Sequence, residues 1–342
     1  MDLKTIAVDL MGGDNAPHDI VEGAFEASAE FGVEIALVGV KDALEGCMSR
    51  LRLHGGRSSV RVVPVEATQV VGAAESAAEA WRGKKDSSIA VGIRMVKEGR
   101  ADAFVSAGNT GAIAATSLFS LRTMVGVDRP AIASLYSTLD GSAALFLDIG
   151  ANVDCRPRFL FQFGQMGSVF MSKIFRMKAP RVGLLSNGVE GEKGTKLVKE
   201  THKLLKESDL NFVGNVEGFD VLSGVADVIV TDGFTGNVVL KLAESLASSI
   251  FHSLKDALDG NLLARASKPL WGPPVMSVAK QWDYSNVGGA LLLGVNGNIV
   301  MAHGRSDAAD ISSAIGLAQK MVGEGWYRPQ PESVQQTVAS NV

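Results

Sequence analysis

The chain has few cysteines, and the two it has lie far apart. Its 342 residues include only Cys47 and Cys155, which form no C-x-x-C pair. Disulfide-stapled domains and cysteine-based zinc sites need paired or closely spaced cysteines. The pattern therefore argues against both and is typical of a protein of the reducing cytoplasm.

Neither sign of charge dominates, and no apolar run is long. The chain carries 33 basic and 37 acidic residues, a formal net charge of −4, whereas nucleic-acid-binding domains show a basic excess. No uninterrupted apolar run reaches the roughly 18 residues that cross a bilayer as a helix. The first residues, MDLKTIAVDL, lack the basic start of an export signal. We expect a cytoplasmic protein with no nucleic-acid partner and with at most peripheral membrane contact.

Signatures of several common enzyme classes are missing. The sequence has no G-x-G-x-x-G after its first strand, no H-E-x-x-H and no G-x-S-x-G. Their absence argues against standard dinucleotide, zinc-protease and serine-hydrolase chemistry. The segment 188–195 is similar to a P-loop only superficially, because Lys193 is not preceded by glycine. We expect neither a metal nor a cofactor.

Short apolar runs alternate with helix-like segments along most of the chain. Alternation of this kind is typical of an α/β fold, a mainly parallel, doubly wound sheet with helices on both faces. We expect a single two-lobed domain over residues 1–327 and a loose tail over 328–342. The predicted strands are 6–10, 35–39, 60–65, 103–105, 144–149, 182–185, 228–230 and 299–302.

One long helical pattern, residues 238–281, departs from this alternation and predicts a projecting helical hairpin. An apolar helical surface is most often a subunit interface or core. Basic residues beside Leu and Trp also suit the headgroup region of an anionic membrane, and the two uses can coexist. The candidate interface or membrane residues are Leu262, Leu263, Leu270 and Trp271.

Two Gly-rich polar turns lie between predicted strands and helices. Residues 231–237 (TDGFTGN) precede a helix expected from Val238, and residues 106–111 (SAGNTG) follow the strand 103–105. Backbone N–H groups and the helix dipole can hold an anion at such turns. The candidate phosphate- or substrate-binding residues of these two turns are Ser106, Asn109, Thr110, Gly111, Asp232, Thr235, Gly236 and Asn237. Among possible helix caps or near-caps we count Asn109, Thr195 and Asn237.

Two further turns place carboxylates at strand ends, where open α/β sheets bind ligands. Residues 9–17 (DLMGGDNAP) contribute Asp9, Gly13 and Asp14, and residues 148–154 (DIGANVD) contribute Asp148 and Asn152. For the first turn, a structural Asx turn explains the pattern about as well as a site does.

Lys193 precedes another predicted helix. A cation at a helix start opposes the helix dipole unless an anion binds there. This conflict makes Lys193 the strongest candidate for a charge that binds phosphate or stabilises an oxyanion.

Eight co-linear stretches together match one family pattern. They are residues 7–17, 84–88, 105–112, 148–155, 165–168, 215–218, 232–238 and 288–295. In these stretches the chain resembles the bacterial phosphate acyltransferases of phospholipid synthesis, the PlsX family. It departs from the family pattern near 74–76, 186–190 and 287–291.

The resemblance implies a reversible acyl transfer from acyl carrier protein to inorganic phosphate. The acyl phosphate would then serve a membrane glycerol-3-phosphate acyltransferase in phosphatidic acid synthesis. The resemblance also implies a phosphotransacetylase- or isocitrate-dehydrogenase-like sheet, a homodimer and loose association with the inner face of the cell membrane. Because phosphate is itself a nucleophile at neutral pH, the absence of a nucleophile motif fits this chemistry.

For this reaction we expect Lys193 and Asn237 to be the catalytic residues. Lys193 and the turn 235–237 would hold phosphate or the thioester oxygen, and Asn109 with Thr110 would complete the cradle. The Asp148 and Asp232 carboxylates would orient donors, since a carboxylate beside phosphate repels it. Two alternatives stay open: a coenzyme A-dependent phosphotransacetylase, and a non-catalytic scaffold that senses phosphate or lipid.

Overall fold

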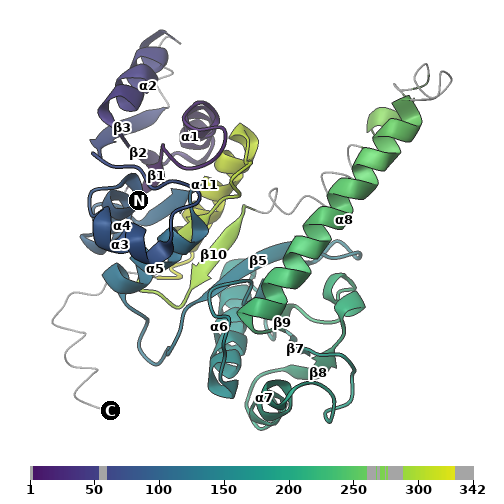
Figure 1. Ribbon diagram of the computed structural model, residues 1–342. Helices are drawn as coiled ribbons and strands as arrows, with labels where there is room; N and C mark the ends of the chain where they lie inside the picture. Colours follow the sequence, from purple (N-terminus) through teal and green to yellow (C-terminus); the bar gives the residue numbers. More distant parts are fainter. Residues whose placement is uncertain are drawn as a thin grey trace. The chain divides into compact units, whose positions relative to one another are not determined.

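The computed structural model describes residues 3–53, 60–259, 267, 270–273, 275 and 288–327. The contacts within the chain divide it into two units (Figure 1). Unit 1 comprises Met1–Val127 and Gly294–Val342, and unit 2 comprises Asp128–Leu293. The predicted tail 328–342 lies outside the described residues.

Unit 1 is built on a parallel sheet with the strand order β3-β2-β1-β4-β11. Because the strands are parallel, their carboxyl ends share one edge of the sheet. The strands are β1 (Thr5–Asp9), β2 (Glu34–Gly39), β3 (Arg61–Glu66), β4 (Ala103–Ser106) and β11 (Asn298–Met301). The helices are α1 (His18–Phe31), α2 (Lys41–Leu53), α3 (Ala77–Gly83), α4 (Ser88–Lys97), α5 (Thr110–Leu121) and α11 (Ala308–Gly323).

Unit 2 contains a mixed sheet with the strand order β10-β5-β6-β9-β7-β8. The pairs from β6 to β8 are parallel, whereas β5 runs antiparallel to both of its neighbours. The strands are β5 (Ala131–Ser137), β6 (Ala143–Leu147), β7 (Val182–Leu185), β8 (Phe212–Val216), β9 (Val228–Val230) and β10 (Ala290–Leu293). The helical segments are α6 (Pro157–Phe175), α7 (Lys196–Lys206), the 3-10 turn η1 (Gly218–Leu222) and α8 (Gly233–Asp259).

The predicted fold class is confirmed, and each of the eight predicted strands corresponds to an observed one. Three strands were not predicted, namely β5, β8 and β10. The sequence of β8, FVGNV, contains Gly214 and Asn215, two residue types that are depleted in strands. The single two-lobed domain remains a prediction.

The predicted start of the helix at Val238 is wrong, because α8 begins at Gly233. The Asp232 carboxylate accepts hydrogen bonds from the backbone N–H and the hydroxyl of Thr235, each at 2.8 Å. Asp232 therefore caps the first turn, and Asn237 is not a cap. The other two predicted caps are confirmed: the side chains of Asn109 and Thr195 accept from a backbone N–H in the first turn of their helices.

Helix α8 is long (Figure 1), and most of its residues beyond the first turns are exposed. Of the predicted hairpin 238–281, the structure describes α8 as far as Asp259 and a short helical piece at 270–273. Leu262 and Leu263 lie outside the described residues, whereas Leu270 is 81% exposed. Within the described ranges, no helix combines the length and the apolar character needed to span a bilayer.

Candidate active site

Three adjacent parallel strands of unit 2 present predicted site residues at their carboxyl ends. Asp148 directly follows β6, Asp232 lies just beyond β9, and Lys193 lies on the loop after β7. Strand β9 pairs in parallel with both β6 and β7. The structure therefore brings these three residues, far apart in sequence, to one edge of the same sheet, where α/β folds bind ligands.

The fully buried Asp148 carboxylate organises the loop that follows it. Its Oδ1 accepts from the backbone N–H groups of Ile132, Gly150 and Ala151 at 3.0, 3.1 and 3.0 Å. Its Oδ2 accepts from the backbone and side-chain nitrogens of Asn152 at 2.7 and 2.8 Å. Burial raises the pKa of Asp148, and the hydrogen bonds oppose that rise. These contacts fit an organising role for this carboxylate.

The Asp148 loop packs tightly against the first turns of α8. A β-carbon on Gly236 would overlap the backbone carbonyl of Asp148. A β-carbon on Gly150 would lie 3.8 Å from the Cβ and Cγ atoms of Asn237. The side chain of Asn237 therefore lies beside the loop, and only glycine at position 236 permits this approach.

Most donors at the start of α8 have partners within the protein. Gly233 donates its N–H to the Asn152 carbonyl at 2.8 Å, and Thr235 donates both its N–H and its hydroxyl to Asp232. Asn237 differs, because its side chain is exposed and has no hydrogen-bond partner among the described residues. An oxyanion at this place would therefore meet the Asn237 amide more readily than Thr235.

Lys193 lies on the exposed loop between β7 and α7. Its backbone N–H donates to the Glu190 carbonyl at 3.0 Å, and a β-carbon on Gly188 would approach its Cγ to 2.8 Å. The aliphatic stem thus lies over Gly188. Among the described residues the ammonium has neither an ion pair nor a hydrogen bond, so its charge is available to an anion.

Two residues outside the predicted site, Asn215 and His202, support this loop. In β8, the buried Asn215 donates from Nδ2 to the Glu190 carbonyl at 2.8 Å. Its Oδ1 lies 2.9 Å from Nδ1 of His202 on α7. The local sequence feature that could have indicated Asn215 is a polar residue near the carboxyl end of a strand.

Cys155 lies close to the Asp148 loop but is unsuited to be a nucleophile. Its thiol donates to the Asn152 carbonyl at 3.4 Å. Burial, reinforced by nearby carboxylates, raises the pKa of Cys155 to about 12. The thiol therefore stays protonated at neutral pH, and the reactive thiolate is scarce.

In unit 1, Asp9 and Ser106 form a buried pair at the ends of β1 and β4. The Asp9 Oδ2 accepts from the Ser106 hydroxyl at 2.7 Å, and its Oδ1 accepts from the Met11 N–H at 3.0 Å. Burial raises the pKa of Asp9. Because Asp9 is only 1% exposed, this pair connects two strands rather than presenting a carboxylate to solvent.

Asn109 uses both ends of its amide inside unit 1. Its Oδ1 accepts from the Ala112 N–H at 2.9 Å. Its Nδ2 donates to the carbonyls of Gly72, Ala73 and Glu75 at 3.3, 3.0 and 2.9 Å. Asn109 is therefore both the cap of α5 and the anchor of the 72–75 loop.

The remaining predicted residues of unit 1 lie near the same edge of its sheet. The backbone N–H of Asp14 donates to the Gly304 carbonyl at 2.7 Å, and Gly13 has a positive φ of 102°. Thr110 and Gly111 are exposed and form the first turn of α5.

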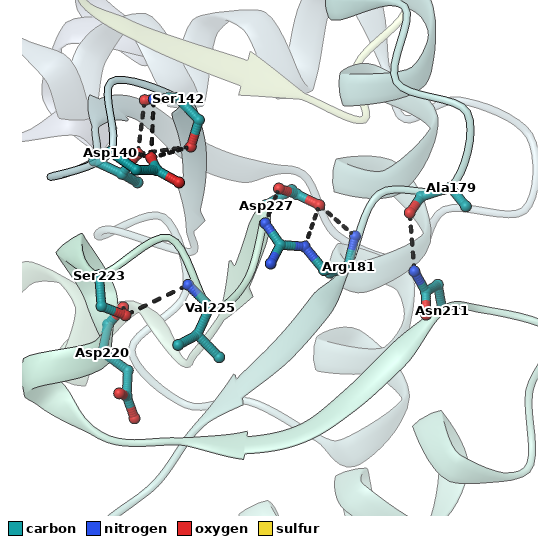
Figure 2. Close-up of polar contacts among 10 residues, drawn as sticks. Asp140, Ser142, Ala179, Arg181, Asn211, Asp220, Ser223, Val225 and Asp227 are labelled. Carbon is teal, nitrogen blue, oxygen red and sulfur yellow. Dashed lines mark hydrogen bonds and ion pairs between the residues drawn. The ribbon is translucent and has the colours of Figure 1, made fainter.

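The opposite edge of the unit 2 sheet is held by an ion pair (Figure 2). Arg181, just before β7, contacts Asp227, just before β9, through Nη2 and Nε at 2.7 and 3.0 Å. Burial alone would raise the pKa of Asp227, but the hydrogen bonds from Arg181 hold it below its usual range. This pair stabilises the amino ends of the strands. In the part of the chain that the structure describes, no cluster of His, Cys, Asp or Glu is suited to a metal.

Proteins of known sequence resemble the chain over nearly its whole length. A family model described as fatty acid synthesis protein matches residues 4–328. The phosphate acyltransferase of Geobacillus sp. (strain WCH70) is 44% identical over 332 residues, 97% of this chain and 98% of the relative. The phosphate acyltransferase of Heliobacterium modesticaldum is 46% identical over 329 residues, 96% of this chain and 97% of the relative.

Solved structures with a similar fold are more distant in sequence. A phosphotransacetylase from Streptococcus pyogenes aligns with a TM-score of 0.61 at 18% identity, covering 94% of each chain. The EutD phosphotransacetylase from Staphylococcus aureus aligns at 0.59 and 16% identity, covering 93% of this chain and 94% of the other. These likenesses show the phosphotransacetylase-like fold. The sequence relatives confirm the resemblance noted above, and the chain belongs to the phosphate acyltransferase family of fatty acid synthesis proteins.

Proposed function

We propose that the protein transfers a fatty acyl group reversibly from acyl carrier protein to inorganic phosphate. The observation that carries the proposal is the ammonium of Lys193, which has no partner among the described residues and lies at the sheet edge that also holds the Asp148 loop and the start of α8. Membership of the phosphate acyltransferase family supports the same reaction. The product, an acyl phosphate, would be used by a membrane glycerol-3-phosphate acyltransferase to make phosphatidic acid.

In the proposed mechanism, a phosphate oxygen attacks the carbonyl carbon of the thioester. The carbon–oxygen bond forms, negative charge moves to the carbonyl oxygen, and collapse of this tetrahedral species breaks the carbon–sulfur bond. The carrier leaves as a thiolate that takes a proton from water. Lys193 and the Asn237 amide would hold phosphate or the developing oxyanion. Donors that are already in position before the reaction stabilise the charge of the transition state and so lower the activation barrier. The pKa of Cys155 makes an acyl-cysteine intermediate unfavourable.

The assignment of Lys193 and Asn237 is tested by alanine substitution. Lys193→Ala and Asn237→Ala should each lower turnover about 100-fold, the usual cost of removing one oxyanion donor. Lys196→Ala is the matched control, because Lys196 is an exposed cation three residues away whose ion pair is with Glu200, at 3.7 Å. Wild-type rates of acyl phosphate formation in both folded variants would contradict the assignment.

The acyl donor separates this proposal from the phosphotransacetylase alternative. Acyl carrier protein and coenzyme A thioesters with the same acyl chain should be compared at saturating phosphate. A higher kcat/KM with the carrier protein supports the proposal, and the reverse order favours the alternative. If neither donor yields acyl phosphate, the remaining hypothesis is the non-catalytic scaffold that senses phosphate or lipid.

We also propose that α8 forms the interface of a homodimer. Apolar side chains recur every four residues on its exposed surface, a spacing that keeps them on one slowly turning stripe. Contiguous exposed apolar surface of this kind is typical of an interface. The stripe consists of Phe234, Val238, Leu242, Leu246, Ile250 and Leu254, which are 38% to 63% exposed.

Light scattering after size-exclusion chromatography tests the dimer. The wild type should be dimeric and Leu246→Asp monomeric, whereas the control Ser248→Asp places the same charge two residues away and should stay dimeric. A monomeric wild type would overturn the proposal.

Loose association with the inner membrane face is a separate proposal, supported by the exposure of Leu270. Wild-type protein should float with anionic phospholipid vesicles and Leu270→Asp should not. Equal flotation of the two proteins would contradict membrane contact through Leu270.

A further inference from the structure

We infer that His202 and Asn215 are positioning residues for Lys193, acting through the backbone carbonyl of Glu190. The inference rests on the proposed function, in which Lys193 binds phosphate or the developing oxyanion. It adds two residues that do not touch substrate but hold the loop that carries the charge.

The Glu190 carbonyl is the point where the support meets the loop. It accepts the backbone N–H of Lys193 at 3.0 Å and the side-chain Nδ2 of Asn215 at 2.8 Å. Asn215 is buried in β8, 6% exposed, whereas Glu190 and Lys193 are exposed. One hydrogen bond therefore joins a rigid strand to the turn that ends at Lys193.

The orientation of the Asn215 amide follows from its two partners. A carbonyl oxygen can only accept, so the side of the amide that faces Glu190 must be the NH₂ group. The Asn215 Oδ1 then faces Nδ1 of His202 at 2.9 Å. Nδ1 must carry a proton to donate this bond. With Nδ1 protonated, the hydrogen bonds to His202 and Glu190 together hold the amide in this orientation.

The imidazole of His202 is itself held in place. It packs edge-on against Phe212, with ring centroids 5.1 Å apart and an interplanar angle of 77°. A β-carbon on Gly191 would lie 3.0 Å from Nε2 of His202, so glycine at position 191 lets the loop lie directly over the ring. The support thus runs from α7 and β8 to the loop residues 190–193.

The Lys193 side chain gains little orientation from other contacts. Among the described residues its ammonium has no partner, and its stem lies over Gly188. The backbone of the 190–193 turn therefore decides where the charge is placed. Misplacing a catalytic group by about 1 Å can cost roughly 100-fold in rate, so a positioning effect should be measurable.

The test compares two substitutions that break the support with one that keeps it. Asn215→Asp is nearly isosteric but presents an oxygen to the Glu190 carbonyl, and His202→Leu removes the donor at Nδ1. Each should lower kcat/KM for phosphate about tenfold, because Lys193 binds phosphate or the developing oxyanion. His202→Asn places an amide nitrogen where Nδ1 lies and should restore kcat/KM to within about threefold of wild type.

A stability control uses the same helix. Thr201 on α7 is fully buried and donates its hydroxyl to the Leu197 carbonyl at 2.8 Å. Thr201→Val should lower the thermal midpoint without changing kcat/KM for phosphate. This control separates loss of the support from general weakening of α7.

A double mutant separates failure of this inference from failure of the proposed function. If the support acts only through Lys193, His202→Leu should have little further effect in a Lys193→Ala background. Full activity of Lys193→Ala would contradict the proposed function itself. Impaired Lys193→Ala together with a wild-type kcat/KM for phosphate in His202→Leu and Asn215→Asp would overturn this inference alone.

Discussion

The backbone carbonyl of Asp148 occupies the place that a β-carbon on Gly236 would take. The obstacle is main chain, so a rotamer change cannot relieve it. The same contact sets the first turns of α8 against the buried loop that follows β6. The position of Asn237, one residue later, therefore depends on the absence of a side chain at 236.

Substitution of Gly236 should damage both stability and activity. Gly236→Ala should lower the free energy of unfolding by at least about 2 kcal/mol, because an overlap with backbone moves the helix or the loop. Acyl phosphate formation should fall as Asn237 shifts. The control is Gly218→Ala, whose new β-carbon would meet nothing within 4 Å and should cost less than about 0.5 kcal/mol. Equal urea midpoints for the two variants would refute the packing argument.

Asn109 should contribute to the stability of unit 1, whether or not it contacts substrate. Asn109→Ser keeps an oxygen that can cap α5 but loses the three bonds to the 72–75 loop, whereas Asn109→Ala loses both. Loss of a cap costs about 1 kcal/mol, so Asn109→Ala should be less stable than Asn109→Ser by about that amount. Thermal unfolding measures the order. Equal stability of the two variants would show that the cap contributes nothing.

Cys155 should be chemically silent. With a pKa of about 12, only about one thiol in ten thousand is ionised at pH 8. In a Cys47→Ala background, iodoacetamide at pH 8 should label unfolded protein and leave the folded protein unlabelled. Cys155→Ser keeps a donor for the Asn152 carbonyl and should retain activity within about threefold. A 100-fold loss, or a stable acyl-enzyme, would restore a cysteine mechanism.

The sequence predicted the parallel strands well because buried parallel strands are short continuous apolar runs. It also predicted which strand ends are polar, and β6, β9 and β7 do bring Asp148, Asp232 and Lys193 to one edge. It misplaced the start of α8, since Gly233 and Gly236 read as a turn. Glycine is required at position 236 because of a contact with Asp148, which lies 88 residues earlier in the sequence. A local sequence pattern cannot reveal a contact between residues so far apart.

The support of the Lys193 loop was not predictable for a related reason. His202 and Asn215 come from a helix and the strand that follows it, and they meet at Glu190 only after the chain folds. Asn215 begins the matched stretch 215–218, but this stretch does not indicate which residues Asn215 contacts, and Asn215 is a poor strand former. In the same way, the sequence predicted that Asn109 binds an anion, whereas the structure shows its side-chain Nδ2 donating to the carbonyls of the 72–75 loop.

Asp9 should make stability depend on pH in the direction opposite to an ion-paired carboxylate. Its folded pKa is raised by burial, so the folded state holds the proton more tightly than the unfolded state. Stability of the wild type relative to Asp9→Asn should therefore fall as pH rises from about 4 and level off above the folded pKa. Urea unfolding between pH 4 and 8 measures this difference. Asp14→Asn, on the same loop but exposed, controls for the lost charge. A difference between wild type and Asp9→Asn that stays constant over this range would show that Asp9 does not titrate in the buried state.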